Sequence, residues 1–234
     1  MTEFCFQQIG VIESCFKQKF SIPRQPGLVP QATATILLDP DYSSDEIIRG
    51  LDSFSHLWVI FVFHKSQMSN NKNTVRPPRL GGDKRLGVFA TRSNYRPNPI
   101  GQSVVKLEGI EKNAGQILIK LSGIDFLDGT PVLDVKPYVP YVDSIPTASA
   151  SFAAQAPEKV FDVQIDPKAL EQIQEASRLT GHNIHQFIEE LLVYDPRPRQ
   201  VKPDQVFATR VYNYDLKWRI QQNSVTVISL EINL

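Results

Sequence analysis

Residues 92–101 carry side chains of the types that bind and orient a planar or phosphate-bearing ligand. They read Arg-Ser-Asn-Tyr-Arg-Pro-Asn-Pro-Ile-Gly. Guanidinium groups donate in pairs to carboxylates and phosphates, amides both donate and accept, and a tyrosine ring offers a stacking face. Pro97 and Pro99 restrict their own φ angles and hold Arg96 and Asn98 near extended backbone. We therefore predict a rigid, irregular loop, a setting in which binding and catalysis concentrate.

This segment, called the proline loop below, lies within the most basic part of the chain. Between residues 65 and 106 there are nine basic residues and one acid, Asp83. The whole chain is balanced, with 25 basic and 25 acidic residues, so any nucleic-acid surface must be local. Because asparagines, an aromatic ring and prolines accompany the charges, we favour phosphate binding over a merely solvated basic loop. The basic residues are Lys65, Lys72, Arg76, Arg79, Lys84, Arg85, Arg92, Arg96 and Lys106.

A second group of polar residues occupies residues 125–134, which read Asp-Phe-Leu-Asp-Gly-Thr-Pro-Val-Leu-Asp. Asp128 and Gly129 are a turn-type dipeptide at the end of a predicted strand. The three aspartates are suited to accept hydrogen bonds from ribose hydroxyls or to lie near a cationic ligand. An ordinary β-turn has the same composition, so the pattern leaves both interpretations open.

Two shorter segments are further candidates for a binding site. His64 and Lys65 follow the apolar residues 57–63, where a strand leaving a barrel would place polar groups at the barrel mouth. Taken alone, an ordinary strand end is the simpler interpretation. The segment Pro23-Arg24-Gln25 fits a plain surface loop and a binding loop equally well.

Several common kinds of site are missing from the sequence. No Gly-x-Gly-x-x-Gly follows a strand, no phosphate-loop lysine follows Gly81 and Gly82, and no Gly-x-Ser-x-Gly is present. The four histidines and two cysteines do not form a metal-binding set. No apolar stretch is long enough for a membrane span, and Cys5 and Cys15, without a signal peptide, indicate a reduced, cytoplasmic protein.

Short strands and frequent turns predict a mainly β fold in the first two thirds of the chain. A short helix is expected at residues 45–51, a long polar loop at 68–83 and an extended exit at 137–146. The expected strands occupy residues 4–13, 32–38, 54–63, 86–91, 103–110, 116–124 and 132–135. We interpret residues 1–146 as one closed or nearly closed β-barrel domain.

The remaining residues predict a smaller domain of another type. Residues 147–156 have the small, polar composition of a linker, and residues 157–234 read as an α+β domain. A helical pattern at residues 167–193 is divided at Gly181. Strands are expected at residues 207–212, 216–220 and 224–232.

Taken together, these motifs resemble the TsaA-like family of bacterial tRNA methyltransferases. The resemblance rests on GVFATRSNYRPNPIGQS at 87–103, LDGTPVLDVKPYVPYVD at 127–143 and the two shorter segments, and it covers about residues 5–145. YNYDLKWR at 212–219 is similar to the C-terminal part of bacterial members. The resemblance implies a homodimeric, S-adenosylmethionine-dependent β-barrel methyltransferase. Its implied substrate is N6 of threonylcarbamoyladenosine, at position 37 beside the anticodon of threonine tRNA.

The resemblance also implies which residues contact the cofactor. Backbone groups and Asp128 would meet adenine and ribose, and Arg24 or Arg92 would meet the carboxylate of the methionine part. The implied cofactor-binding residues are Pro23, Arg24, Gln25, His64, Lys65, Arg92, Leu127, Asp128, Gly129 and Thr130.

For catalysis we hypothesise that the proline loop handles the target base. Asn94 or Asn98 would orient N6, Tyr95 would stack on the base, and Arg96 would hold the threonyl carboxylate or a phosphate. The alternatives are a loop that only closes the barrel or contacts a second subunit, and a cofactor-binding RNA-binding or sensor protein without catalysis. The C-terminal domain would either bind the tRNA stem or stabilise the dimer. The basic residues available there are Arg197, Arg199, Lys202, Arg210, Lys217 and Arg219.

Overall fold

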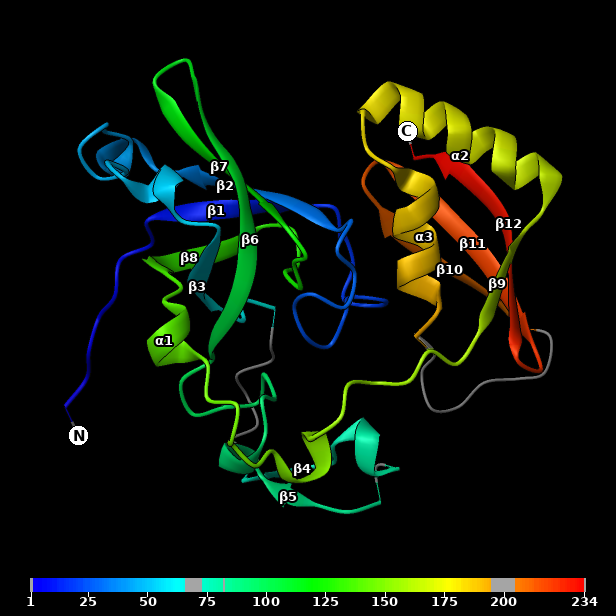
Figure 1. Ribbon diagram of the computed structural model, residues 1–234, viewed down its shortest axis with the longest axis horizontal. Coiled ribbons are helices and arrows are strands. Elements are labelled where there is room, and N and C mark those ends of the chain that lie inside the picture. The colour runs from blue at the N-terminus through cyan, green and yellow to red at the C-terminus, as the bar shows by residue number, and fades with distance from the viewer. Residues whose placement is uncertain (1, 66–72, 82, 195–204, 234) are drawn as a thin grey trace.

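The structure is a computed structural model, and it describes residues 2–65, 73–81, 83–194 and 205–233. Six antiparallel strands close into a barrel in the order β1-β2-β7-β6-β3-β8 (Figure 1). The mainly β barrel expected from the sequence is therefore confirmed. The barrel strands are β1 (Gly10–Ser14), β2 (Thr33–Leu38), β3 (His56–Val62), β6 (Ile100–Asn113), β7 (Gln116–Ser122) and β8 (Thr130–Pro137).

Alternation along the strands fills the barrel interior. In β3 the side chains of Leu57, Val59 and Phe61 are buried, and the residues between them are more exposed. This period of two is what a strand with one buried face requires. Pairing of β1 with β8, from Gly10 with Val132, closes the barrel and removes the open strand edges.

Gly101 in β6 leaves the space that the Phe61 ring occupies. A Cβ atom at Gly101 would lie 2.5 Å from the Cε2 atom of Phe61. That ring packs edge-to-face against Phe126 and Phe63, with centroid distances of 5.0 and 5.1 Å. Gly101→Ala is therefore expected to destabilise the fold by about 1–3 kcal/mol, because Phe61 must leave this packing. Urea unfolding measures the change.

Gly109→Ala, in the same strand, is the matched control for that substitution. No atom lies within 4 Å of the Cβ position at Gly109, so the added methyl group meets open space. The control is expected to unfold at the wild-type urea concentration or slightly above it. Equal stability of the two variants would contradict the packing argument at Gly101.

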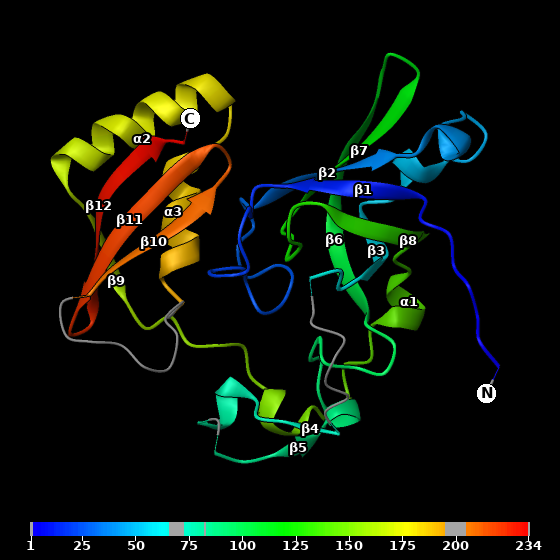
Figure 2. The ribbon, with the colours of Figure 1, turned by 180° about the vertical axis from the view of Figure 1, so that it is seen from behind.

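The C-terminal part is a four-stranded sheet in the order β10-β11-β12-β9, with two helices on one face (Figure 2). Gly181, with φ of 72°, ends the first helix, so the expected division is confirmed. β9 pairs parallel with β12 and was not expected. None of the helices in the described ranges has the length and apolar character for crossing a bilayer. The elements are β9 (Asp162–Ile165), α2 (Pro167–Thr180), α3 (Ile184–Leu192), β10 (Val206–Val211), β11 (Tyr214–Gln221) and β12 (Ser224–Ile232).

The barrel and the C-terminal sheet meet along the chain that connects β1 to β2 (Figures 1 and 2). Phe16 from this connection packs on Phe187 of α3, with ring centroids 5.9 Å apart. Buried side chains of both parts form one continuous hydrophobic cluster. The connection from 15 to 32 carries Pro23-Arg24-Gln25, so this junction adjoins a candidate site segment.

The prediction of a helix at residues 45–51 is wrong. The chain there forms successive turns, and Leu51–Ser53 is a single 3-10 turn, η2. Gly50, directly before it, has φ of 82°, which a right-handed helix does not allow. Seven residues with little apolar burial also provide too few hydrogen bonds and contacts to offset the cost of helix nucleation.

Other expected elements differ in extent. Of the strand expected at 86–91, only two residues pair, and a 3-10 turn follows. The exit at 137–146 contains one helical turn, and the first strand begins at residue 10 rather than 4. Of the loop expected at 68–83, residues 68–72 and 82 lie outside the described residues. These elements are η1 (Pro40–Tyr42), β4 (Thr74–Val75), η3 (Pro78–Leu80), β5 (Leu86–Gly87), η4 (Val88–Ala90), α1 (Pro140–Asp143) and η5 (Ser151–Ala153).

Candidate active site

A direct hydrogen bond joins two of the candidate segments. Nη1 of Arg92 donates to Oε1 of Gln25 over 2.6 Å. Arg92 is exposed and Gln25 is half-buried. The proline loop and the Pro23-Arg24-Gln25 segment therefore meet, although they are 67 residues apart in the sequence.

The turn at Leu127–Thr130 is held against the end of β1. Gly129 adopts φ of 75°, and its N–H donates to the carbonyl of Ile12 over 2.8 Å. The hydroxyl of Thr130 is buried and donates to the carbonyl of Leu127 over 2.6 Å, which closes the turn. Hydrogen bonds within the chain therefore set the geometry of this turn.

Asp128 anchors this turn through its carboxylate. Oδ1 accepts the backbone N–H of Ser14 over 2.8 Å and pairs with the Lys17 ammonium at 2.9 Å. The Asp128 N–H donates to the carbonyl of Phe16 over 2.9 Å. One carboxylate oxygen is thus engaged by the chain itself, at the start of the connection that leads to Pro23.

His64 and Lys65 lie beside the proline loop at the end of β3. The N–H of Phe63 donates to the carbonyl of Pro99 over 2.8 Å, and the ammonium of Lys19 donates to the carbonyl of Lys65. Burial, together with the charges of Lys65 and Lys19, lowers the pKa of His64 below its ordinary value. The imidazole is therefore neutral at physiological pH. The end of β3 thus contacts the proline loop through Pro99 and the connection between β1 and β2 through Lys19.

The proline loop is braced by its own side chains. Nη1 of Arg96 donates to the carbonyls of Thr91 at 2.7 Å and Val88 at 3.3 Å. The Arg96 guanidinium also lies 5.8 Å from the ring centroid of Phe89. Arg96 therefore holds the loop in shape in this structure, and its remaining N–H groups are the ones left for a ligand.

Of the other loop residues in the catalytic hypothesis, Tyr95 and Asn98 are exposed. Tyr95 is 40% exposed, and its N–H donates to the hydroxyl of Ser93 over 3.2 Å. Asn98 is exposed, and its backbone carbonyl accepts from Ile100 over 2.7 Å. Asn94 is half-buried. The loop thus presents an aromatic face and an amide on a backbone that internal hydrogen bonds hold in place.

Asp125 is one of the three aspartates that the sequence singled out in residues 125–134, but it is not among the implied cofactor-binding residues. Its Oδ1 accepts from the hydroxyl of Ser103, inside the barrel, over 2.7 Å. Burial raises the pKa of Asp125 to about 6, although the Ser103 hydrogen bond and the charge of Arg92 act in the opposite direction. The sequence left open whether this aspartate contacts a ligand or belongs to an ordinary β-turn.

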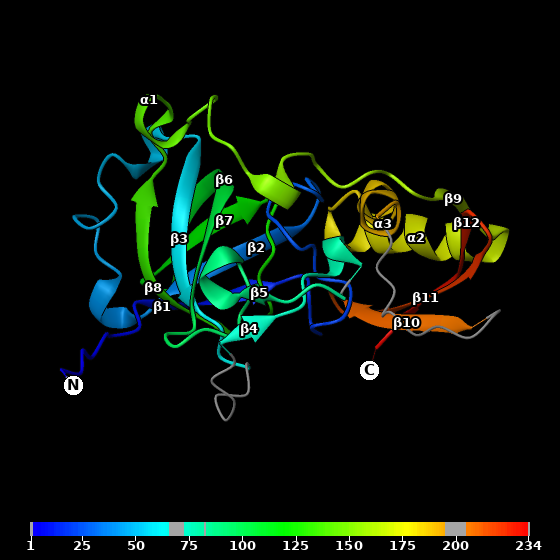
Figure 3. The ribbon, with the colours of Figure 1, turned by 90° about the horizontal axis from the view of Figure 1, so that it is seen from below.

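Some of the other basic residues are exposed to solvent, and some pair with acidic side chains of the protein. Arg76, Lys84 and Arg85 are exposed near β4 and β5, which lie to one side of the barrel (Figure 3). In the C-terminal sheet Arg210 pairs with Asp215 at 3.4 Å, and Lys217 pairs with Glu231 at 2.8 Å. Lys72, Arg197, Arg199 and Lys202 lie outside the described residues.

The structure has the closed antiparallel barrel that the family resemblance implied, and one hydrogen bond joins its cationic proline loop to the amide-bearing Pro23-Arg24-Gln25 segment. Sequence models of known protein families also match this chain. The model for the tRNA-methyltransferase O N-terminal domain matches residues 11–144, and that for the TrmO C-terminal domain matches residues 158–233. The chain belongs to the tRNA-methyltransferase O family.

Related proteins align with nearly the whole length of this chain. The tRNA (adenine(37)-N6)-methyltransferase of Escherichia coli K12 is 42% identical over 234 residues, with 99% of each chain covered. A putative S-adenosylmethionine-dependent methyltransferase of Pseudomonas aeruginosa is 46% identical over 212 residues, 90% of each chain. The crystal structure of TrmO from P. aeruginosa superimposes with a TM-score of 0.83 at 39% identity, covering 99% of this chain and 98% of that one.

Proposed function

We propose that this protein is an S-adenosylmethionine-dependent tRNA (adenine(37)-N6)-methyltransferase that acts on threonylcarbamoyladenosine in threonine tRNA. The observation that carries the proposal is the convergence of the family's motif segments in one region, joined by the bond from Arg92 to Gln25. We further propose a cytoplasmic homodimer. The matches at residues 11–144 and 158–233 support a division into a catalytic domain 1–146, a linker 147–156 and a C-terminal domain 157–234.

The residues at the candidate site fit S-adenosylmethionine. Its carboxylate suits the guanidinium of Arg92 or Arg24, both of which are exposed. Its adenosine suits backbone groups of the Leu127–Thr130 turn and the amide of Gln25. We therefore assign cofactor contact to the Pro23–Gln25 segment, His64, Lys65, Arg92 and this turn.

The protein's own part in the reaction is positioning. The bound cofactor supplies an electrophilic methyl group on a sulfonium. Tyr95 stacks on the modified base, and the side-chain carbonyl of Asn98 or Asn94 accepts a hydrogen bond from N6–H, which holds the N6 nitrogen in line. The free N–H groups of Arg96 meet the threonyl carboxylate or a phosphate.

The test is methyl transfer to tRNA from cells that lack this gene. The purified chain is incubated with methyl-labelled S-adenosylmethionine and this tRNA, which is then digested to nucleosides. Label in N6-methylated threonylcarbamoyladenosine from threonine tRNA is the expected result. Cofactor binding without any label would instead support a cofactor-binding sensor, and label in another nucleoside would contradict the proposed substrate.

A further inference from the structure

The cofactor loop, residues 20–31, is fastened to the C-terminal sheet rather than to the barrel alone. This loop contains Pro23-Arg24-Gln25 and lies between the barrel and α3 (Figures 1 and 2). Within the barrel, Gly27 donates to the carbonyl of Gly123 over 2.7 Å, and Gly123 donates to that of Pro30 over 3.2 Å. A proline-interrupted loop has few backbone hydrogen bonds, so its other contacts decide how well it is ordered.

The chain leading into the loop adds to the sheet. Phe16 forms a β-bridge with Val211, and the N–H of Lys17 donates to the carbonyl of Arg210 over 3.3 Å. The N–H of Tyr212 donates back to the carbonyl of Cys15 over 2.7 Å. The connection therefore leaves the barrel as a partner of β10.

The first turn of the loop is clamped between aromatic rings and a buried hydroxyl. Phe20 stacks on Trp218, with centroids 5.8 Å apart and planes 4° from parallel. The hydroxyl of Ser21 donates to that of Thr209 over 2.9 Å, and Thr209 donates to the carbonyl of Phe20 over 3.2 Å. Thr209 is 2% exposed, and Ser21 has φ of 70°, which a serine rarely adopts. The contact thus holds an unfavourable backbone turn two residues before Pro23.

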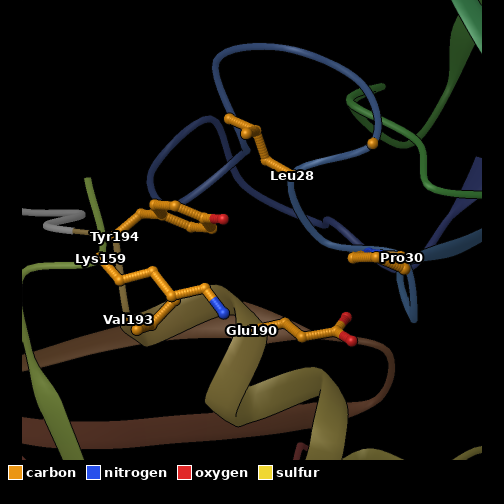
Figure 4. A pocket seen from close by; sticks show the side chains of 7 residues that line it. Leu28, Pro30, Lys159, Glu190, Val193 and Tyr194 are labelled. Atoms are coloured by element: carbon orange, nitrogen blue, oxygen red, sulfur yellow. The ribbon is translucent and has the colours of Figure 1, made fainter. Parts of the chain in front are cut away.

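The far end of the loop is held by α3. Oε2 of Glu190 accepts the backbone N–H of Gln31 over 2.8 Å, and Oε1 accepts from Gln186 over 3.0 Å. Beside this contact is a cavity of about 170 Å³, between α3 and the loop residues 27–30. Figure 4 shows Lys159, Glu190 and Tyr194 around it. The loop is thus anchored at both ends, and the cavity lies against its residues 27–30.

We propose that Thr209 and Glu190 are positioning residues that set the affinity for S-adenosylmethionine by ordering the cofactor loop. This inference rests on the proposed function, which assigns cofactor contact to Pro23-Arg24-Gln25. A loop that is already ordered loses little conformational freedom on binding, and each released residue would add to the entropic cost of association. The C-terminal domain then acts on the cofactor site without touching the cofactor.

The test separates cofactor affinity from the chemical step. Thr209→Val keeps the shape of the side chain and removes the hydroxyl. It is expected to raise the Kd and KM for S-adenosylmethionine about tenfold, with kcat at saturating cofactor and the KM for tRNA unchanged. Thr209→Ser restores the hydroxyl and is expected to restore the wild-type Kd. Thr226→Val, in β12 of the same sheet, is the control with no expected change. Calorimetric titration of the full chain measures the Kd.

Glu190 gives a second, independent variant if Thr209→Val folds poorly. Glu190→Ala is expected to weaken cofactor binding, and Glu190→Gln, which keeps an acceptor for Gln31, to bind as the wild type does. Unchanged affinity in both Thr209→Val and Glu190→Ala would overturn the inference. Gln25→Ala is measured beside them, because unchanged affinity in that variant would overturn the assignment of the loop itself and the inference with it.

Discussion

Asn98→Ala is expected to lower kcat for tRNA methylation about 100-fold and to leave the Kd for S-adenosylmethionine unchanged. The expectation follows from the proposal that the side-chain carbonyl of Asn98 orients N6, since losing a single positioned polar group commonly costs two to three orders of magnitude in turnover. The loop itself keeps its shape in the variant, because the hydrogen bond from Ile100 is accepted by the backbone carbonyl of Asn98. Single-turnover methylation with a saturating cofactor concentration measures the step.

Two further variants sharpen this result. Asn98→Asp keeps a carbonyl-type oxygen and is expected to retain more activity than the alanine variant. Asn113→Ala changes an exposed asparagine at the end of β6 and is expected to behave as the wild type does. Wild-type turnover in Asn98→Ala would remove Asn98 from the mechanism and leave Asn94 as the candidate.

Asp125→Asn is expected to stabilise the fold at neutral and alkaline pH. Burial raises the pKa of Asp125 from 3.8 to about 6. Between these values the folded state binds more protons than the unfolded state, so this residue's contribution to stability falls as the pH rises through the window. An asparagine has no charge to bury, keeps an acceptor for Ser103, and is expected to gain up to about 3 kcal/mol above pH 7.

Urea unfolding at pH values from 4 to 8 measures that difference. The gain of Asp125→Asn is expected to shrink as the pH falls and to be small at pH 4, because the folded aspartate is then protonated and the unfolded one, with its ordinary pKa of 3.8, is close to half protonated. Asp52→Asn, at an exposed position in η2, removes the same charge elsewhere and is the control. A variant less stable than the wild type at pH 8 would show that attraction to Arg92 outweighs the cost of burial.

The fold could be predicted largely because barrel strands have a local signature. The apolar run at residues 57–63 and the turn at residues 113–115 are both visible in the sequence. The prediction of a helix at 45–51 failed because Gly50, with φ of 82°, interrupts a weak and short local pattern. β9 was missed because four residues with two apolar side chains carry little signal, and its partner β12 lies about 60 residues away.

The candidate site could be predicted as segments, but not as contacts. The sequence and its resemblance singled out Arg92 and Gln25 separately, and only the folded chain joins them. Arg96 illustrates the same limit, since its type suggests a ligand, whereas its Nη1 donates to carbonyls of its own loop. The raised pKa of Asp125 could not be predicted, because it depends on desolvation by the surrounding strands and on the contact with Ser103.

The contacts between the β1–β2 connection and the C-terminal sheet also determine when, during synthesis, the cofactor loop becomes ordered. Translation delivers the N-terminal part first, and the last barrel strand ends at Pro137. The hydroxyl that Ser21 contacts belongs to Thr209, 188 residues later in the chain. A nascent chain can therefore complete its barrel on the ribosome while this loop still lacks its anchor. Full affinity for the methyl donor would then be reached only after β10 has formed and Thr209 has joined the loop.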